Sequence, residues 1–312
     1  MPLLRFLPEA TKINFVGARY IAFAIDGLLL LASIASLLVH GFNLGIDFTG
    51  GVSVEVKSPQ RIEIGLLRAE VESLGFKETQ IQNVGGGECE KPANSCALIR
   101  VQPESDAANQ EAVIKLKAKL DKDYKFRSTN TVGPKVSGEL FRAGVTATLL
   151  AVLAIGAWVA VRFEWQYGIS AALATGHDVL VTAGLFSILH LDFTLTSIAA
   201  LLTLAGYSIN DTVVVFDRIR ENRRKFKRMS LGDLINLSTN QMMTRTILTS
   251  AATAVSIVPL LIWGGPSLRD FSAAILFGIV VGTFSSIYVA AALLLYLPAP
   301  AGSLDADADA VA

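Results

Sequence analysis

The apolar residues of this chain gather in six long blocks. The first block precedes a long segment of mixed composition, and the other five follow that segment in close succession. Each block is close to or above the ~20 residues that a helix needs to cross a bilayer. The blocks cover residues 20–39, 141–161, 168–189, 193–216, 246–263 and 271–297. The pattern predicts a polytopic α-helical membrane protein with six transmembrane helices.

Residues 40–140, between the first two blocks, show the short periodicities of a folded domain. Valines alternate with polar residues near its start, which predicts a strand, and apolar residues then recur at helical spacing. The expected elements are a strand over 48–56, a helix over 61–74, strands over 78–84 and 97–101, a helix around Val113, Leu116 and Leu120, and a strand over 124–131. This βαββαβ order predicts an α+β ferredoxin-like domain.

Basic residues near the block ends indicate the orientation. Arg5, Lys12 and Arg19 precede the first block, Arg162 follows the second, and a basic cluster at 218–228 follows the fourth. The two short connections on the opposite side contain a single arginine between them. Cytoplasmic loops of membrane proteins are enriched in Lys and Arg, so both termini are expected in the cytoplasm and the folded domain outside it. The expected cytoplasmic segments are an N-terminal stretch 1–19, a basic loop 217–245 and an acidic tail 298–312.

Two polar residues interrupt the fourth apolar block. Asn210 and Asp211 lie well inside it, roughly 9 Å from its basic end at 1.5 Å per residue. An Asp in the hydrocarbon core costs about 2.5–3.5 kcal/mol on insertion scales, so it normally faces a bundle interior and takes part in ion or proton traffic. Asp211 is therefore the leading functional candidate. The alternative is a structural hydrogen bond to Asn210 or to a hydroxyl of a neighbouring helix.

The third block contains His177 and Asp178 at a similar depth, because adjacent spans run in opposite directions. Ionisable residues at one depth suggest a buried polar layer. Two alternatives are a His–carboxylate pair that holds two helices together and an intramembrane acid–base enzyme. Asp26, near the start of the first block, is interpreted as interfacial.

The fifth block supplies a candidate counter-charge. Arg245 precedes it, and Thr249, Thr253 and Ser256 follow at +4, +8 and +11, on one helical face. Such a face can line a wet path between helices. Alternatively, Arg245 extends to the lipid headgroups and the hydroxyls bond carbonyls of their own helix.

The chain has two cysteines, Cys89 and Cys96, which flank a turn of the extracytoplasmic domain. Their spacing allows a disulfide in that compartment, and two free thiols are the alternative. A metal site is disfavoured because two cysteines without a nearby His supply only half of a zinc cage. No catalytic triad, phosphate-binding loop or metal-ligand motif occurs in the sequence. We therefore expect no enzyme activity and no cofactor other than protons as coupling ion.

Several longer motifs match a known family. They are GIDFTGG at 45–51, GHD at 176–178, GYSINDTVVVFDRIREN at 206–222, TRTILTS at 244–250 and GTFSSIYVA at 282–290. Together they closely resemble the SecF family of bacterial protein translocase subunits, within the SecD/SecF group related to resistance-nodulation-division transporters. The resemblance extends from about residue 20 to residue 297.

The resemblance implies a multi-pass protein of the bacterial inner membrane that pairs with SecD and associates with the SecYEG channel. SecA, YajC and YidC are further candidate partners, with translocating preproteins and membrane lipid, and no nucleic acid contact is expected. The pair would use the proton-motive force to help export preproteins. On the family pattern, Asp211 and Arg245 are proton-path residues, beside which His177, Asp178 and Asn210 stand as further candidates.

The GIDFTGG segment directly follows the first apolar block. Gly50 and Gly51 permit a tight backbone, so this segment, with Gly45 and Asp47, is expected to join the membrane helices to the first strand and to transmit motion. A plain turn is the alternative. The competing function is half of a proton-coupled small-molecule exporter, which would usually need about twice as many spans in an internal repeat.

Overall fold

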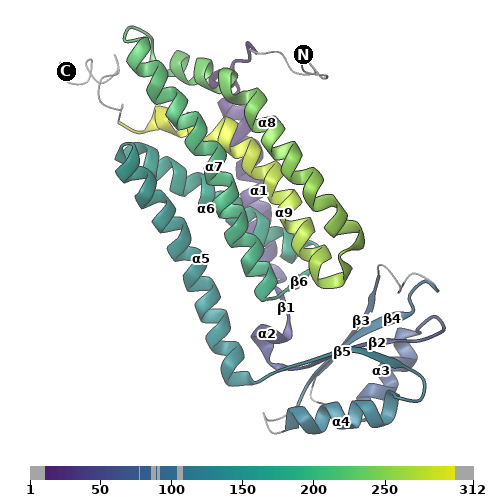
Figure 1. Cartoon of the computed structure of the whole chain (residues 1–312). Coiled ribbons are helices and arrows are strands. Elements are labelled where there is room, and N and C mark those ends of the chain that lie inside the picture. Colours follow the sequence, from purple (N-terminus) through teal and green to yellow (C-terminus); the bar gives the residue numbers. More distant parts are fainter. Residues whose placement is uncertain (1–10, 77, 86–88, 90–91, 104–107, 299–312) are drawn as a thin grey trace.

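A computed structural model describes residues 11–76, 78–85, 89, 92–103 and 108–298 (Figure 1). This part contains six helices long and apolar enough to cross a membrane, and the chain is a multi-pass membrane protein. They are α1 (Phe15–Val39), α5 (Pro134–Arg162), α6 (Trp165–Ile188), α7 (Leu195–Lys225), α8 (Leu231–Trp263) and a sixth helix. The sixth helix begins as α9 (Gly265–Ser285) and continues through a π-helical segment (Ser286–Ala290), α10 (Ala291–Leu293) and a 3-10 turn (Leu294–Tyr296).

The six helices divide into an inner and an outer set. In α6, α7 and the sixth helix, 61%, 50% and 67% of the apolar window is buried within the chain, against 22% in α1 and 11% in both α5 and α8. Small residues bring the outer helices close. A Cβ on Gly184 of α6, for example, would lie 2.2 Å from the Cβ of Ser33 on α1. The buried polar layer described below lies on the inner helices and on the faces that contact them.

The α/β domain follows α1 and precedes α5. It consists of β2 (Gly51–Lys57), α3 (Ile64–Glu72), β3 (Glu78–Val84), β4 (Cys96–Gln102), α4 (Ala108–Leu120) and β5 (Lys125–Val132). The antiparallel sheet has the order β3-β4-β2-β5. The alternating valines of β2 are fully buried with apolar residues of α3 and α4 in one core. The predicted ferredoxin-like fold with six membrane helices is confirmed.

The first strand begins later than the alternation predicts. Residues Ile46–Thr49 form a short helix, α2, and β2 begins at Gly51. Gly50 and Gly51 have φ angles of +74° and +115°, which turn the chain sharply between the two elements. Phe48 therefore does not pack in the domain. It is buried among apolar residues of the membrane helices.

Helix extends into the segment expected as a basic loop. α7 runs to Lys225, and α8 begins at Leu231, where the Ser230 side chain accepts a hydrogen bond from the backbone N–H of Asp233. The Arg and Lys residues of this segment are good helix formers, but a hydropathy pattern does not detect a polar helix. Arg245 consequently lies in the middle of α8 rather than at its start.

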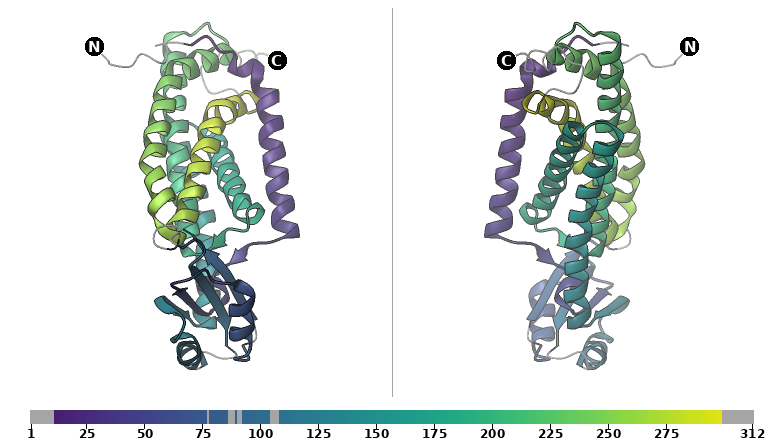
Figure 2. Two further views of the ribbon diagram at one scale, coloured as in Figure 1. Left: turned by 90° about the vertical axis from the view of Figure 1, so that its right-hand side faces the viewer. Right: turned by 90° about the vertical axis from the view of Figure 1, so that its left-hand side faces the viewer.

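The first and the last membrane helix bring the two ends of the described chain to the same end of the molecule. The Arg19 Nε donates a hydrogen bond to the Tyr296 hydroxyl at 3.2 Å, so the start of α1 lies beside the end of the sixth helix. Figures 1 and 2 show the α/β domain at the opposite end. A parallel pair of two-residue strands, β1 (Asn43–Leu44) and β6 (Asp192–Phe193), links that end of α1 to the α6–α7 connection.

Candidate functional site

Asp211 lies in the middle of α7 and is buried, with an exposed fraction of 3%. Two hydroxyls of α8 donate to its carboxylate, Thr249 to Oδ1 at 3.5 Å and Ser250 to Oδ2 at 3.4 Å. Both hydrogen bonds are long and therefore weak. Among the described residues, none forms an ion pair with Asp211. The structure thus has a carboxylate inside the helix bundle that is held only by weak hydrogen bonds from the described residues.

Arg245 is on the neighbouring helix α8 but does not contact Asp211. Its side chain is exposed on the surface of the isolated chain. The hydroxyls that share its face mostly bond their own helix: Thr253 donates to the Thr249 carbonyl and Ser256 to the Thr253 carbonyl. Of this face, only Thr249 is within reach of the carboxylate, and its hydroxyl lies closer to the carbonyl oxygens of Thr246, at 2.9 Å, and Arg245, at 3.1 Å.

His177 and Asp178 form a second polar group. The His177 Nδ1 lies 3.0 Å from Oδ1 of Asp178, which is completely buried. The other oxygen of Asp178 accepts hydrogen bonds from Ser208 of α7 at 2.5 Å and from Ser285 of the sixth helix at 2.8 Å. Asp178 therefore joins three inner helices, an arrangement that fits the structural alternative for this residue as well as the functional one.

Hydroxyls of the sixth helix lie between the two carboxylates. Thr283 contacts Ser250, the donor to Asp211, at 2.7 Å, and Ser285 donates to Asp178. Ser286 opens the π-helical segment and contacts Thr212 at 2.9 Å. π-helical segments occur frequently at functional sites. In the sequence, the signal for these residues is the set of hydroxyls at 282–290 within an otherwise apolar block, and the apolar pattern alone predicts no role for them.

Asn210 is not part of this polar layer. It is exposed on α7 and shares one face of that helix with Thr203 and Gly206, which are also exposed. Exposing polar groups to the hydrocarbon core of a bilayer costs free energy, so such a helix face is normally covered by protein. Asn210 and Asp211 are adjacent in sequence, but Asn210 is on the outer face of α7 and Asp211 is on its buried face.

The GIDFTGG segment contacts the start of α7. The Asp47 carboxylate accepts a hydrogen bond from the backbone N–H of Leu195 at 3.0 Å, and the N–H of Gly45 donates to the carbonyl of Phe193 at 2.8 Å. Next to this contact, Arg100 of β4 forms a bidentate ion pair with Asp192 of β6. The helix that carries Asp211 is therefore attached directly to the domain at one end.

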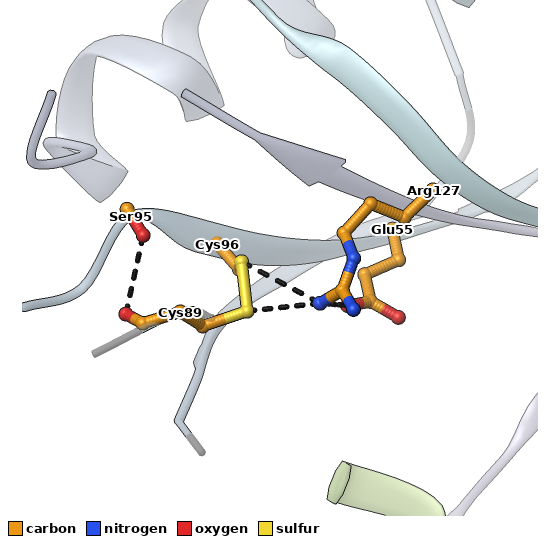
Figure 3. The surroundings of a disulfide bond; sticks show 5 residues. All are labelled: Glu55, Cys89, Ser95, Cys96 and Arg127. Atoms are coloured by element: carbon orange, nitrogen blue, oxygen red, sulfur yellow. Dashed lines mark hydrogen bonds and ion pairs between the residues drawn. A yellow bond between two sulfur atoms is a disulfide. The ribbon is translucent and has the colours of Figure 1, made fainter. Parts of the chain in front are cut away.

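Cys89 and Cys96 are joined in a disulfide (Figure 3). Both cysteines are buried, and the guanidinium of Arg127 lies beside them, with Nη1 at 3.0 Å from the Cys89 sulfur and 2.7 Å from Glu55 Oε1. The bridge holds the segment before β4 against the sheet. Of the two alternatives that the sequence left open, the structure has the bridged one.

We expect the double variant Cys89→Ser/Cys96→Ser to lower the free energy of unfolding of the α/β domain by about 2.5 kcal/mol. The reason is that a cross-link closing a loop of this length reduces the entropy of the unfolded chain, which raises its free energy by about that amount at 25 °C. The measurement is the denaturant dependence of trypsin cleavage within the domain of the purified chain. Reduction of the unmodified protein should reproduce the effect. Equal resistance of the oxidised, reduced and double-variant proteins would contradict a stabilising role.

Comparison with known proteins gives consistent matches. The family model described as "Protein export membrane protein SecD/SecF, C-terminal" matches residues 112–299, and that described as "SecD/SecF GG Motif" matches residues 35–58. The protein translocase subunit SecF of Rhodobacter capsulatus is 42% identical over 305 residues, with 94% of this chain and 91% of that protein covered. SecDF of Brucella abortus is 38% identical over 292 residues, with 94% of this chain but 38% of that protein covered.

Two solved structures match the fold. SecDF from Thermus thermophilus, described as a translocon-associated membrane protein, is 38% identical with a TM-score of 0.83 over 93% of this chain. SecDF in a super-membrane-facing form is 39% identical with a TM-score of 0.66 over 95% of this chain. In both cases the chain spans only 39% of the length of the SecDF chain.

Proposed function

Because the chain belongs to the SecD/SecF family of protein export membrane proteins, we propose that it couples the proton-motive force to preprotein export through SecYEG, as the SecF subunit of a SecD–SecF complex. Membership of this family makes it a component of membrane transport rather than an enzyme. The observation that carries the proposal is Asp211, a buried carboxylate without an ion-pair partner among the described residues, midway along an apolar helix.

The proton switch works through the charge of this carboxylate. Within the described part of the chain, ionised Asp211 has two long hydrogen bonds and no ion-pair partner, so an arrangement that brings Arg245 to it favours the ionised form. A proton from outside the cell neutralises the Asp211 carboxylate and breaks its ion pair with Arg245. Each proton that crosses 100 mV supplies about 2.3 kcal/mol, which biases a rearrangement between two packings of the bundle.

The motion reaches the domain along α7. Its first residue, Leu195, donates to Asp47 of the GIDFTGG segment, and Gly50 and Gly51 lead from there into β2. The two SecDF structures support a fold with more than one arrangement, since they have nearly equal identity to this chain but TM-scores of 0.83 and 0.66. In this proposal the domain is periplasmic, both termini are cytoplasmic, and the domain acts on the emerging preprotein.

SecD covers the exposed polar face of α7 and the exposed side chain of Arg245. Relatives named SecDF carry the matched region as part of one longer chain, which supports a second subunit beside it. Thr203, Gly206 and Asn210 face outward on the isolated chain, and burying them against SecD removes the cost of exposing polar groups to lipid. SecYEG, with SecA, YajC and YidC, is contacted by the assembled complex.

The variant Gly206→Trp is expected to lose co-purification with SecD. A Cβ at Gly206 meets nothing within 4 Å in the isolated chain, so the large side chain is tolerated by the fold and obstructs only a partner. Leu31→Trp is the matched control, because Leu31 is 67% exposed on α1, a helix that packs mainly on α6 and the sixth helix. Co-purification of both variants at the native level would exclude this face as the contact.

The proposed function as a whole is tested by preprotein translocation into inverted vesicles that contain SecYEG and SecD, with and without this chain. A proton gradient is expected to stimulate translocation only when the chain is present. Stimulation of the same size in its absence would contradict the proposal.

A further inference from the structure

Asp26 of α1 is a buried carboxylate that the switch at Asp211 does not use. Its place near the start of the first apolar block predicts an interfacial position, but its exposed fraction is 4%, and within the described part of the chain neither carboxylate oxygen has a hydrogen-bond partner. Leaving a buried polar group without a partner costs about 1–3 kcal/mol, and more for a charged one. A residue in this environment needs an explanation beyond packing.

Asp26 faces His177 across a short gap. The His177 Nε2 lies 4.0 Å from Oδ1 of Asp26 and has no hydrogen-bond partner in the described structure, while Nδ1 is bonded to Asp178. The imidazole therefore stands between one carboxylate from α1 and one from α6. The titratable groups whose charge acts on Asp26 are His177 and Asp178, both from α6.

The charges of this group do not balance without an additional proton. With His177 protonated and both carboxylates ionised, the net charge is negative by one unit, and with neutral His177 it is negative by two. A buried uncompensated charge is strongly unfavourable. One further proton on Asp26 makes the group neutral, and a small approach of α1 to α6 then brings the protonated Nε2, now 4.0 Å from Oδ1, within hydrogen-bond distance of the Asp26 carboxyl group.

We propose that Asp26, His177 and Asp178 form a second proton-binding site, separate from Asp211, whose occupancy fixes α1 against α6. The proton-loaded group joins the two helices through Asp26 and His177. The deprotonated group carries excess negative charge, and the two carboxylate-bearing helices repel each other. This inference extends the proposed function, since it adds a second proton to the coupling, but it does not depend on a role for Asp211.

The rest of the α1–α6 contact permits α1 to shift. Ser33 packs directly on Gly184, and the hydroxyls of Ser36 and Ser187 lie 2.8 Å apart. At these two contacts, small side chains rather than large interdigitating groups lie between the helices. α1 is an outer helix that continues through β1 and α2 into the first strand of the domain, as Figure 2 shows. A shift of α1 therefore reaches the domain along the chain itself, through the same GIDFTGG segment that is bonded to the start of α7.

Proton uptake on acidification tests the site directly, with a pH-sensitive dye and the purified complex with SecD. Asp26→Asn is expected to lose about one bound proton per chain relative to the native protein, and Asp26→Glu should retain it. Asp211→Asn should lose a separate proton, so the double variant loses both. Unchanged uptake in Asp26→Asn would overturn the second site, whereas unchanged uptake in Asp211→Asn alone would contradict only the proposed switch.

If Asp26→Asn does not assemble, His177→Asn provides the same test, since its side chain can still donate to Asp178 but cannot carry the proton. Uptake equal to that of the native complex would then overturn the proposal. The role of α1 is tested by cross-linking the double variant Ser36→Cys/Ser187→Cys, since the hydroxyl oxygens that the sulfur atoms replace lie 2.8 Å apart. Oxidation should abolish gradient-stimulated export in the double variant and not in either single variant. Full stimulation of the cross-linked protein would refute a required shift of α1.

Discussion

The variant Asp211→Asn is expected to lose all stimulation of preprotein export by a proton gradient, with export falling to the level measured without a gradient. Asparagine has nearly the same size as aspartate, and its amide oxygen can accept one of the two hydrogen bonds from Thr249 and Ser250 while its NH2 group donates to the other hydroxyl. It cannot take up or release a proton, so its charge is the same in every step of the cycle. The assay is translocation into inverted vesicles that contain the complex with SecD.

The matched control for this variant is Asp217→Asn. Asp217 is on the same helix, six residues later, but its side chain is exposed, so we expect native stimulation after its replacement. Equal stimulation of native, Asp211→Asn and Asp217→Asn complexes would show that Asp211 is structural. Ser250→Ala should give an intermediate effect because it removes one of the two hydrogen bonds to the carboxylate.

The variant Gly51→Ala is expected to unfold the start of β2 and to separate the domain from the membrane helices. Gly51 has a φ of +115°, and a Cβ there would lie 2.5 Å from the backbone carbonyl oxygen of Val101. Neither the backbone conformation nor the contact can be relieved by a side-chain rotation. A destabilisation of about 3 kcal/mol follows from strain of this kind, with loss of resistance to trypsin within the domain.

Gly65→Ala is the control for this substitution. Gly65 is in α3 of the same domain, and a Cβ there meets nothing within 4 Å. Alanine in a helix is favoured over glycine by about 1 kcal/mol, so this variant should be at least as resistant to trypsin as the native protein. If Gly51→Ala were also as resistant, the strain argument for the joint would be wrong.

The fold could be predicted from the sequence because both the apolar blocks and the shorter periodicities between them agree with it. Apolar blocks of membrane-spanning length and the βαββαβ periodicity are local signals, and the confirmed architecture follows from them. The start of β2 was placed too early because Phe48 fits the alternation of a strand, whereas in the structure it packs on the membrane helices. That contact joins segments far apart in the chain, which periodicity cannot detect.

The candidate site was predictable only in part for a similar reason. Asp211 and Asp178 stand out as carboxylates within apolar blocks, but Ser208, Thr283 and Ser285 do not, since hydroxyl residues are common in membrane helices and can bond their own backbone. Asp26 was assigned to the interface from its position near a block end. Its burial depends on where α6 packs against α1, and no property of the first block alone reveals that.

The measurement that tests the central claim most directly is the infrared difference spectrum of the complex between neutral and acidic pH, in the region of the C=O stretch of protonated carboxyl groups. We predict a band that is absent in Asp211→Asn and shifted in Ser250→Ala, because Ser250 is hydrogen-bonded to that carboxylate. This result would identify Asp211 as a group that binds the proton. A spectrum that is identical in the native protein and Asp211→Asn would contradict the account.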